Sequence, residues 1–260
     1  MKNVLLSNDL YTISIPGKGK DYTIEKTLQD IEGTYATIFR EKISKRLPLS
    51  EEEHIMLCVF VAAMLQRTLR HKDSVEKFSN DIAEMFSKME IKHGVPPLKS
   101  LEAKKYVENA HKTELINSIP EISKILFNMS LAFLCTPSRK GKFITSDDPC
   151  TLFNPDLQWQ AFNGPGLGQK AVQLTLPLSP YITLCLTWSS IRGYMIATES
   201  MVEDINRMTR ASCYKYFISH TTWLKLVWFS RYPFSVVFMI RVFKKRVLER
   251  LIAFIKRKRI

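Results

Sequence analysis

Residues 172–187 read VQLTLPLSPYITLCLT. Apolar and polar side chains alternate through residues 173–176 and again through 181–187, and a period of two is typical of β-strands with one buried face. The Pro-Leu-Ser-Pro element between them breaks the pattern, with Leu178 facing the core and Ser179 in a tight turn. The segment therefore predicts two neighbouring strands, and with them a sheet in the C-terminal half of the chain.

The β-rich pattern extends outward from this segment over residues 136–198. Two further short runs bounded by turn residues, 142–146 and 193–197, predict additional strands. The glycine-rich stretch 163–168 does not end in Gly-Lys-Ser/Thr, and a strand follows it, so a plain connection is expected there rather than a phosphate-binding loop. Residues 199–220 predict a helix that returns to the sheet.

Residues 22–135 instead carry helical periodicity. The first helix, of about six turns, is marked by apolar residues at near-helical spacing: Ile24, Leu28, Ile31, Tyr35, Ile38 and Ile43. Ser50 followed by Glu53 forms a capping-box signature for a second helix. Its apolar run, 55–65, is too short to span a membrane and therefore predicts a central helix of a bundle.

Three more helices complete the predicted bundle, at 73–89, 100–117 and 120–134. The first of them should turn its apolar residues inward: Val75, Phe78, Ile82, Met85, Phe86 and Met89. The sequence thus predicts an α+β fold, with an N-terminal helical bundle packed on a small, mostly antiparallel sheet. Residues 1–222 should form a single domain, with a basic C-terminal helical tail after it.

The net charge of +13 is concentrated in that tail. Residues 223–260 hold eleven Lys and Arg against one acid, Glu249, which leaves only +3 for residues 1–222. A partner attracted by charge is therefore expected to bind the tail, and the candidates are an anionic membrane surface and nucleic acid.

Three fates are open for the tail. About ten apolar residues in 224–242 favour membrane insertion by roughly 0.3–0.6 kcal/mol each, but a mid-span arginine costs about 2.5–3.5 kcal/mol, so insertion is near break-even. Farther on, apolar residues from Ile240 to Ile255 share a helical face, with lysines and arginines largely off it, as in a helix that lies on a membrane surface. The third fate is no membrane contact, either as a packed C-terminal helix or as an appended segment with no selected role.

The five cysteines are widely spaced and include no Cys-x-x-Cys pair. This pattern argues against a disulfide framework and a zinc knuckle, and the apolar start of the chain is too short for a signal peptide. We therefore expect a cytoplasmic body, peripheral at the membrane if the tail binds there. The sequence specifies no cofactor and no oligomeric state.

The candidate site is Thr145-Ser146-Asp147-Asp148-Pro149, at the end of a predicted strand. One interpretation is structural: the hydroxyls and carboxylates bond to the local backbone and the proline closes the strand. The other is functional: one aspartate serves as a general base or as the partner of an arginine, with Thr145 and Ser146 as hydrogen-bonding groups. No second acidic cluster supports a metal site.

Arg67 and Asn206 are the other candidate ligand-binding residues. Arg67 follows directly on the buried helical run and needs a partner, because an unpaired buried charge is costly; Asp147 or Asp148 is the natural one. Asn206, on the last helix, is either an exposed polar residue or a ligand contact. The five histidines share no spacing typical of a metal site or a catalytic triad, and His71, between Arg70 and Lys72, predicts a solvated face.

The order of these elements resembles a bacterial family known as domain of unknown function 4238. The matching elements are Asp9 to Thr12, Ile24-Glu25 with Ile31-Glu32, Gln66-Arg67-Thr68, Phe143 to Pro149, Pro177 to Pro180, and Ile205-Asn206. The resemblance covers roughly residues 9–220, and the Thr-Ser-Asp and Pro-Leu-Ser-Pro elements in that order are its most specific part. It supports the fold and the location of the site, and it implies no reaction.

This sequence departs from the family pattern at both ends. Members usually begin with a His-Tyr-Val-Pro segment, whereas the first histidine here is His54. If that segment carries a catalytic or ligand-binding histidine of the family, we expect this chain to lack it, either as a truncated or misannotated reading frame or as a non-catalytic relative. Members commonly stop near residue 220, before the tail. Two functions follow as hypotheses: a ligand- or nucleic-acid-binding, hydrolase-like domain with Asp147 and Asp148 as catalytic carboxylates, or a non-catalytic module attached to membrane or nucleic acid through residues 223–260.

Overall fold

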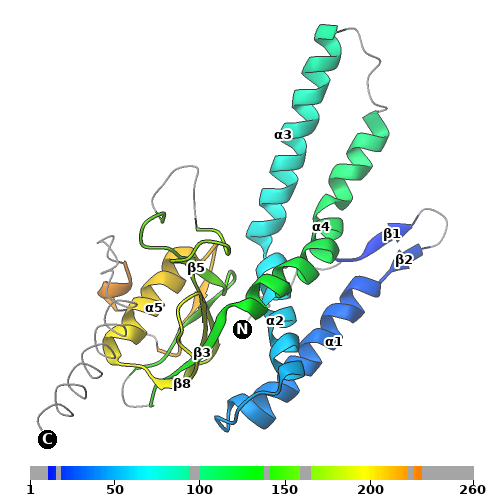
Figure 1. Cartoon of the computed structure of the whole chain (residues 1–260). Coiled ribbons are helices and arrows are strands. Elements are labelled where there is room, and N and C mark those ends of the chain that lie inside the picture. The colour runs from blue at the N-terminus through cyan, green and yellow to red at the C-terminus, as the bar shows by residue number, and fades with distance from the viewer. Residues whose placement is uncertain are drawn as a thin grey trace, which may run out of the picture.

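The computed structural model describes residues 11–15, 19–93, 100–137, 141–158, 165–221 and 225–229. Helices from the N-terminal half lie on one side of a sheet from the C-terminal half, and the last long helix, α5 (Glu199–Ser212), lies on the other side (Figure 1). The fold is α+β, as the sequence predicted.

The helical part is built around α2 (Glu51–Gln66), which packs against α1 (Thr23–Ile38) and α4 (Ser100–Asn128). At its start, Ser50 Oγ accepts the backbone N–H of Glu53 at 3.2 Å, and the Glu53 carboxylate accepts the N–H of Ser50 at 2.7 Å. This capping box satisfies two donors that the helix itself leaves free. Both the cap and the central position of α2 are confirmed.

The α1 helix continues into a π-helical turn, η1 (Phe39–Ile43). Its predicted apolar face is buried at Ile24, Leu28, Ile38 and Ile43. Tyr35 of α1 stacks on Phe60 of α2, with ring centroids 3.7 Å apart. A small hairpin of β1 (Ile13–Ile15) and β2 (Gly19–Asp21) precedes the helix.

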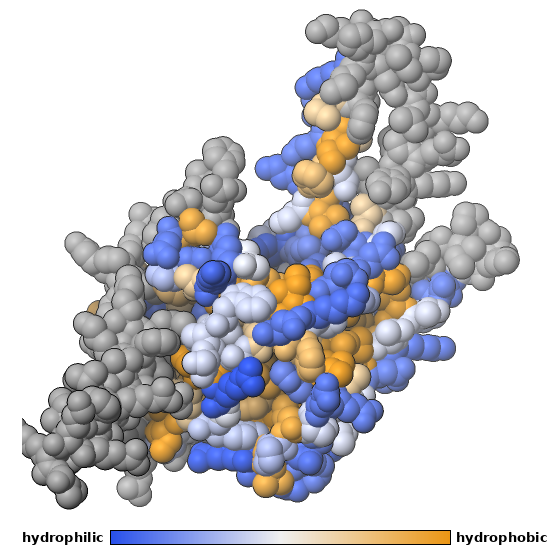
Figure 2. All heavy atoms as spheres, in the orientation of Figure 1, coloured by the Kyte–Doolittle hydropathy of each residue, from blue (hydrophilic) through white to orange (hydrophobic). Residues whose placement is uncertain are grey.

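The pair formed by α3 (Leu69–His93) and α4 projects away from the sheet (Figure 1). Phe78 is 66% exposed and Met85 48% exposed, so the prediction that both face inward is wrong. The reason is that α3 packs mainly on α4, and this contact leaves the side chains of Phe78 and Met85 exposed. Figure 2 shows hydrophobic surface along the projecting helices.

The main sheet has five strands in the order β5-β6-β7-β3-β8. The strands of this sheet are β3 (Ser130–Cys135), β5 (Thr151–Phe153), β6 (Gln173–Ser179), β7 (Ile182–Thr187) and β8 (Gly193–Ile196). All neighbours are antiparallel except β3 and β8. The β6–β7 turn is held by Ser179 Oγ, which accepts the N–H groups of Tyr181 and Ile182 at 3.2 and 3.1 Å. The hairpin predicted from residues 172–187 is confirmed.

The strand β3 occupies residues where the sequence predicted the end of a helix. The α4 helix runs unbroken through Pro120 and ends at Asn128, and Ser130–Cys135 then forms the strand between β7 and β8. Its residues Ala132 to Cys135 are all buried, so the segment has apolar side chains on both faces and no period of two. Such a run cannot be distinguished from a buried helical segment by periodicity.

Each face of the sheet belongs to a different core. One face packs Phe133, Leu174 and Leu184 against the buried side of α2 and the end of α4. The opposite face packs Leu134 and Cys185 against α5, whose buried residues are Val202, Ile205, Asn206, Met208 and Thr209. Residues 142–144 run along this second layer, where Asn206 of α5 holds them by hydrogen bonds, and this sets the start of the candidate site.

A two-stranded ribbon connects that layer to the helical part. In it, β4 (Thr145–Ser146) pairs antiparallel with β9 (Phe217–Ile218). The helix predicted for 199–220 is therefore too long, because α5 ends at Ser212 and the chain then enters β9.

Only residues 225–229 of the predicted basic tail are described, and there η3 (Leu226–Phe229) contacts α5. The predicted amphipathic helix of the tail lies outside the described residues. Within the described part of the chain, no helix combines the length and apolarity needed to cross a membrane.

Candidate functional site

Asn206 holds the segment that leads into the site. Its side chain is 1% exposed; Oδ1 accepts the N–H of Ile144 at 2.9 Å, and Nδ2 donates to the carbonyl of Lys142 at 2.8 Å. An amide can satisfy a backbone donor and a backbone acceptor at once, which explains the residue type at this buried position. The structure thus gives Asn206 a positioning role, where the sequence predicted an exposed side chain or a ligand contact.

Ser146 closes a local turn. Its hydroxyl donates to the carbonyl of Asp148 at 2.8 Å and accepts the Asp148 N–H at 3.2 Å. These are the bonds to the local backbone that the structural interpretation predicts for Ser146. Thr145, half-buried, pairs with Ile218 across the ribbon.

Asp147 organises the chain that follows α5. Its Oδ1 accepts the backbone N–H of Tyr214 at 2.9 Å, and its Oδ2 accepts those of Lys215 and Tyr216 at 2.7 and 3.1 Å. Three N–H groups directed at one carboxylate form a charge-assisted network. Asp147 therefore fixes residues 214–216 against the strand end.

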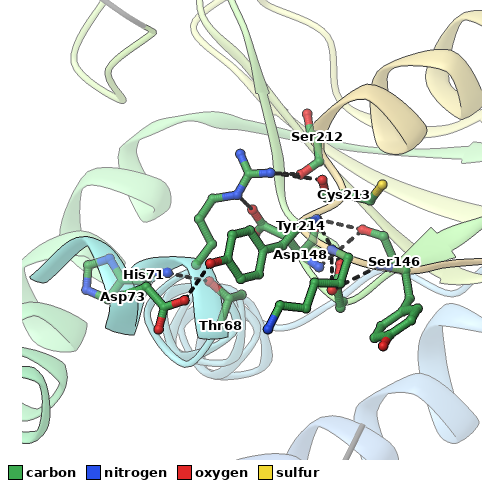
Figure 3. Close-up of polar contacts among 12 residues, drawn as sticks. Thr68, His71, Asp73, Ser146, Asp148, Ser212, Cys213 and Tyr214 are labelled. Carbon is green, nitrogen blue, oxygen red and sulfur yellow. Dashed lines mark hydrogen bonds and ion pairs between the residues drawn. The ribbon is translucent and has the colours of Figure 1, made fainter. Parts of the chain in front are cut away.

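Asp148 forms an ion pair with Arg70, with Oδ2 and Nε 3.0 Å apart (Figure 3). The Asp148 side chain is 14% exposed, and that of Arg70 is 44% exposed. Burial raises the pKa of Asp148 to about 6; Arg70 acts against this rise, and the neighbouring Asp147 adds to it. The carboxyl group thus titrates close to neutral pH, where a side chain can both accept and release a proton.

Arg70 also joins the end of α5 to the site. One Nη of its guanidinium donates to the carbonyls of Ser212 and Cys213 at 2.8 and 3.0 Å. These are among the last carbonyls of the helix, where a cation is favoured by the helix dipole. One side chain of α3 thereby holds the strand end and the helix end together (Figure 3).

The predicted pairing of Arg67 with an aspartate is wrong. Arg67 caps the end of α2 and forms an ion pair with Glu32 of α1, while Arg70, three residues farther on, takes the partner expected for Arg67. The two arginines are separated by the break between α2 and α3, which directs them to different neighbours. The sequence does offer Arg70 as a second candidate partner for the aspartate, three residues after Arg67. The pattern Arg70-His71-Lys72 instead predicts a solvated face, and this hides the candidate.

His71 was attributed to the same solvated face, and this too is wrong. Its Nε2 is buried without a hydrogen-bond partner among the described residues, and its ring centroid lies 5.8 Å from that of His111. His111 is 2% exposed, with Nε2 3.3 Å from the carbonyl of Gln66. Burial lowers the pKa of both histidines.

Tyr214 lies over the site. Its hydroxyl donates to Asp73 at 2.5 Å, and the guanidinium carbon of Arg70 lies 5.7 Å from its ring centroid. No spacing along the chain connects residues 70–73 with residue 214, so the sequence did not indicate that Arg70, Asp73 and Tyr214 lie together.

In the described part of the chain, no group of three His, Cys, Asp or Glu side chains is arranged to hold a metal ion. The five cysteines are free thiols. Burial raises the pKa of the Cys150 and Cys185 thiols, which keeps them protonated and unreactive.

A layer of helices on one face of a small, mostly antiparallel sheet, with one helix on the other face, defines the chain as an α+β protein. The family model described as protein of unknown function (DUF4238) matches residues 1–222, and the chain belongs to this family. No curated protein and no solved structure matches the chain.

Proposed function

We propose that the Arg70–Asp148 pair is the centre of a ligand-binding, hydrolase-like site. The observation that carries this proposal is the partly open ion pair: a carboxyl group with a pKa near 6 lies 3.0 Å from an arginine that remains 44% exposed. An exposed guanidinium suits an anionic ligand, and a carboxyl group that titrates near neutral pH suits proton transfer.

In this proposal the two aspartates have different tasks. Asp148 is the acid–base group, while Asp147, engaged by three backbone N–H groups, is a positioning residue. Arg70 orients the Asp148 carboxylate through Nε and binds the anionic part of the ligand with the rest of its guanidinium. Thr145 and Ser146 set the strand end, and Arg67 supports the junction through Glu32.

An activity assay on phosphoesters tests this assignment. We expect slow hydrolysis of bis(p-nitrophenyl) phosphate by the full chain, with a rate that rises from pH 5 to pH 7 as Asp148 ionises. Asp148→Asn should lower the rate about 100-fold or more, since general acid–base catalysis contributes about 10²–10⁴-fold. Asp30→Asn, which removes an exposed carboxylate on α1, is the matched control and should leave the rate unchanged.

Circular dichroism of each variant separates loss of chemistry from loss of fold. A folded Asp148→Asn protein with the wild-type rate would refute the role of Asp148. No hydrolysis of phosphodiesters or of p-nitrophenyl carboxylic esters by the wild type would refute the hydrolase-like function itself.

A further inference from the structure

One face of the main sheet carries buried polar atoms that have no hydrogen-bond partner in the described part of the chain. The atoms are Thr151 Oγ1, Gln173 Nε2, Thr175 Oγ1 and Thr183 Oγ1. All four residues are at most 2% exposed. A buried polar atom without a partner costs stability, and folded proteins keep few of them. Four such atoms in one sheet therefore indicate a role other than packing.

The register of the strands places these four side chains on the same face. Thr151 of β5 lies opposite Thr175 of β6, which lies opposite Cys185 of β7. Directly opposed residues point to one face of a sheet, and so do residues two positions apart along a strand. Gln173 is two positions from Thr175, and Thr183 is two positions from Cys185. The four side chains thus form one continuous group, which we name the polar face.

The helix α5 covers the polar face (Figure 1). Cys185 packs with the buried side of α5 in the second core, and α5 also contacts β5. The buried side of α5 adds a fifth polar atom, Thr209 Oγ1, which also lacks a partner among the described residues. The layer between the sheet and α5 therefore has an apolar part, around Leu134 and Ile205, and a polar part.

Other polar side chains of the same layer are paired within the fold. Thr187, opposite Gln173 and Ser130 in the ladder, has its Oγ1 3.3 Å from Ser189 Oγ. Ser130 Oγ accepts Arg192 Nε at 3.5 Å. Thr187 is as deeply buried as the residues of the polar face, so burial alone does not leave a hydroxyl unpaired in this layer. The unpaired side chains are a distinct group within it.

The chemistry of this group sets the kind of ligand. A hydroxyl donates and accepts hydrogen bonds, a glutamine Nε2 donates, and neither side chain is charged. Such a set suits an uncharged moiety that is rich in hydroxyl or carbonyl oxygens. Asp148, which is paired with Arg70, is three residues before Thr151, at most about 11 Å of extended chain. An anionic end of the same ligand at Arg70 is therefore within reach of the polar face.

We propose that the polar face binds the hydroxylated part of a sugar phosphate whose phosphate lies at Arg70. The polar face is shielded from solvent in the structure, so the ligand enters when the end of α5 moves. Arg70 holds that end through the carbonyls of Ser212 and Cys213, and a phosphate competes for the same guanidinium. This inference names the ligand class of the proposed site and rests on the proposed function only for the phosphate end.

Replacing threonine by valine tests whether a hydroxyl is satisfied by the protein itself. Valine keeps the shape of the side chain, so Thr175→Val should raise the Tm, measured by circular dichroism without ligand, by about 2 °C or more. Thr187→Val is the matched control and should lower the Tm, because the hydroxyl it removes is paired with Ser189. An equal fall in Tm in both variants would show that Thr175 is satisfied within the fold, and would overturn the proposal.

Isothermal titration calorimetry of the full chain with ribose 5-phosphate and with inorganic phosphate tests the ligand. The wild type should bind ribose 5-phosphate about tenfold or more tighter than phosphate, because the sugar adds hydrogen bonds to the polar face. Thr175→Val should raise the Kd for ribose 5-phosphate about tenfold and leave the Kd for phosphate unchanged, since phosphate contacts Arg70 alone.

Three binding results would also overturn the proposal. They are no binding of ribose 5-phosphate by the wild type, equal Kd values for ribose 5-phosphate and phosphate, and a wild-type Kd for ribose 5-phosphate in Thr175→Val. Asp148→Asn distinguishes this proposal from the preceding one, since it should still bind ribose 5-phosphate while losing hydrolysis. Hydrolysis without binding that depends on Thr175 would reject only this inference, and such binding without hydrolysis would reject only the proposed chemistry.

Discussion

The ionisation of Asp148 is opposed by burial and favoured by Arg70, and the pH dependence of stability shows which effect is larger. The pKa of Asp148 is raised to about 6 in the folded protein, against about 3.9 for an unperturbed aspartate. Between these values the folded state binds more protons than the unfolded state, so the contribution of Asp148 to stability falls as the pH rises. A shift of about two units corresponds to at most about 3 kcal/mol.

Solvent screening reduces this figure, because the carboxylate is 14% exposed and its partner 44% exposed. We therefore expect an effect of about 1 to 3 kcal/mol. Asp148→Asn removes the titrating group and keeps the size of the side chain. The free energy of unfolding of Asp148→Asn minus that of the wild type should become more positive by this amount between pH 4 and pH 8.

Urea denaturation of both proteins at half-unit pH steps measures the difference. Contributions from the histidines cancel, because both proteins contain them. A difference that is constant with pH would mean that the pKa of Asp148 is unshifted. A difference that falls with rising pH would mean that Arg70 outweighs burial, and that the carboxyl group is too acidic for the proposed proton transfer.

Three further predictions concern the supports of the site and the tail. Asn206→Ala should destabilise the protein by about 2 to 4 kcal/mol in urea denaturation, because it leaves the N–H of Ile144 and the carbonyl of Lys142 buried without partners; a loss below about 0.5 kcal/mol, as expected for a surface change such as Asn80→Ala, would contradict the positioning role. Asp147→Ala should speed amide hydrogen exchange of residues 214–216 with little change at α2, and equal exchange in mutant and wild type would remove Asp147 from this role. Deleting residues 223–260 should move the protein from the membrane pellet to the supernatant, and unchanged partitioning would exclude membrane attachment by the tail.

The sequence predicted the parts of the fold that have a clear period or a clear cap. The helix α2, its capping box and the β6–β7 hairpin belong to this group. The strand β3 was missed because a strand that is buried on both faces has no alternation. Phe78 was placed inward because a helical face indicates which side chains share a surface, and not whether another element covers that surface.

The sequence identified the element Thr145 to Pro149 but not its contacts, and its role as a functional site stays a prediction. Thr145 and Ser146 form the short strand β4. The partner of the Asp148 carboxylate is Arg70 and not Arg67, and the choice depends on the break between α2 and α3, which the sequence pattern does not define. Tyr214 could not be found at all, because its relation to Asp73 exists only after the sheet and the helices have packed.

The position of β3 in the sheet has a consequence for synthesis of the protein. Its partners in β7 follow 47 to 57 residues later, at Ile182 for Cys135 and at Thr187 for Ser130. At about 5–20 residues per second, a ribosome needs roughly 2 to 11 s to supply them. During that interval the apolar segment of β3 emerges from the ribosome with both of its edges unpaired. Such a segment is prone to associate with other chains. We therefore expect newly made chains that stop before β7 to depend on chaperones, whereas chains that extend past β8 can complete the sheet themselves.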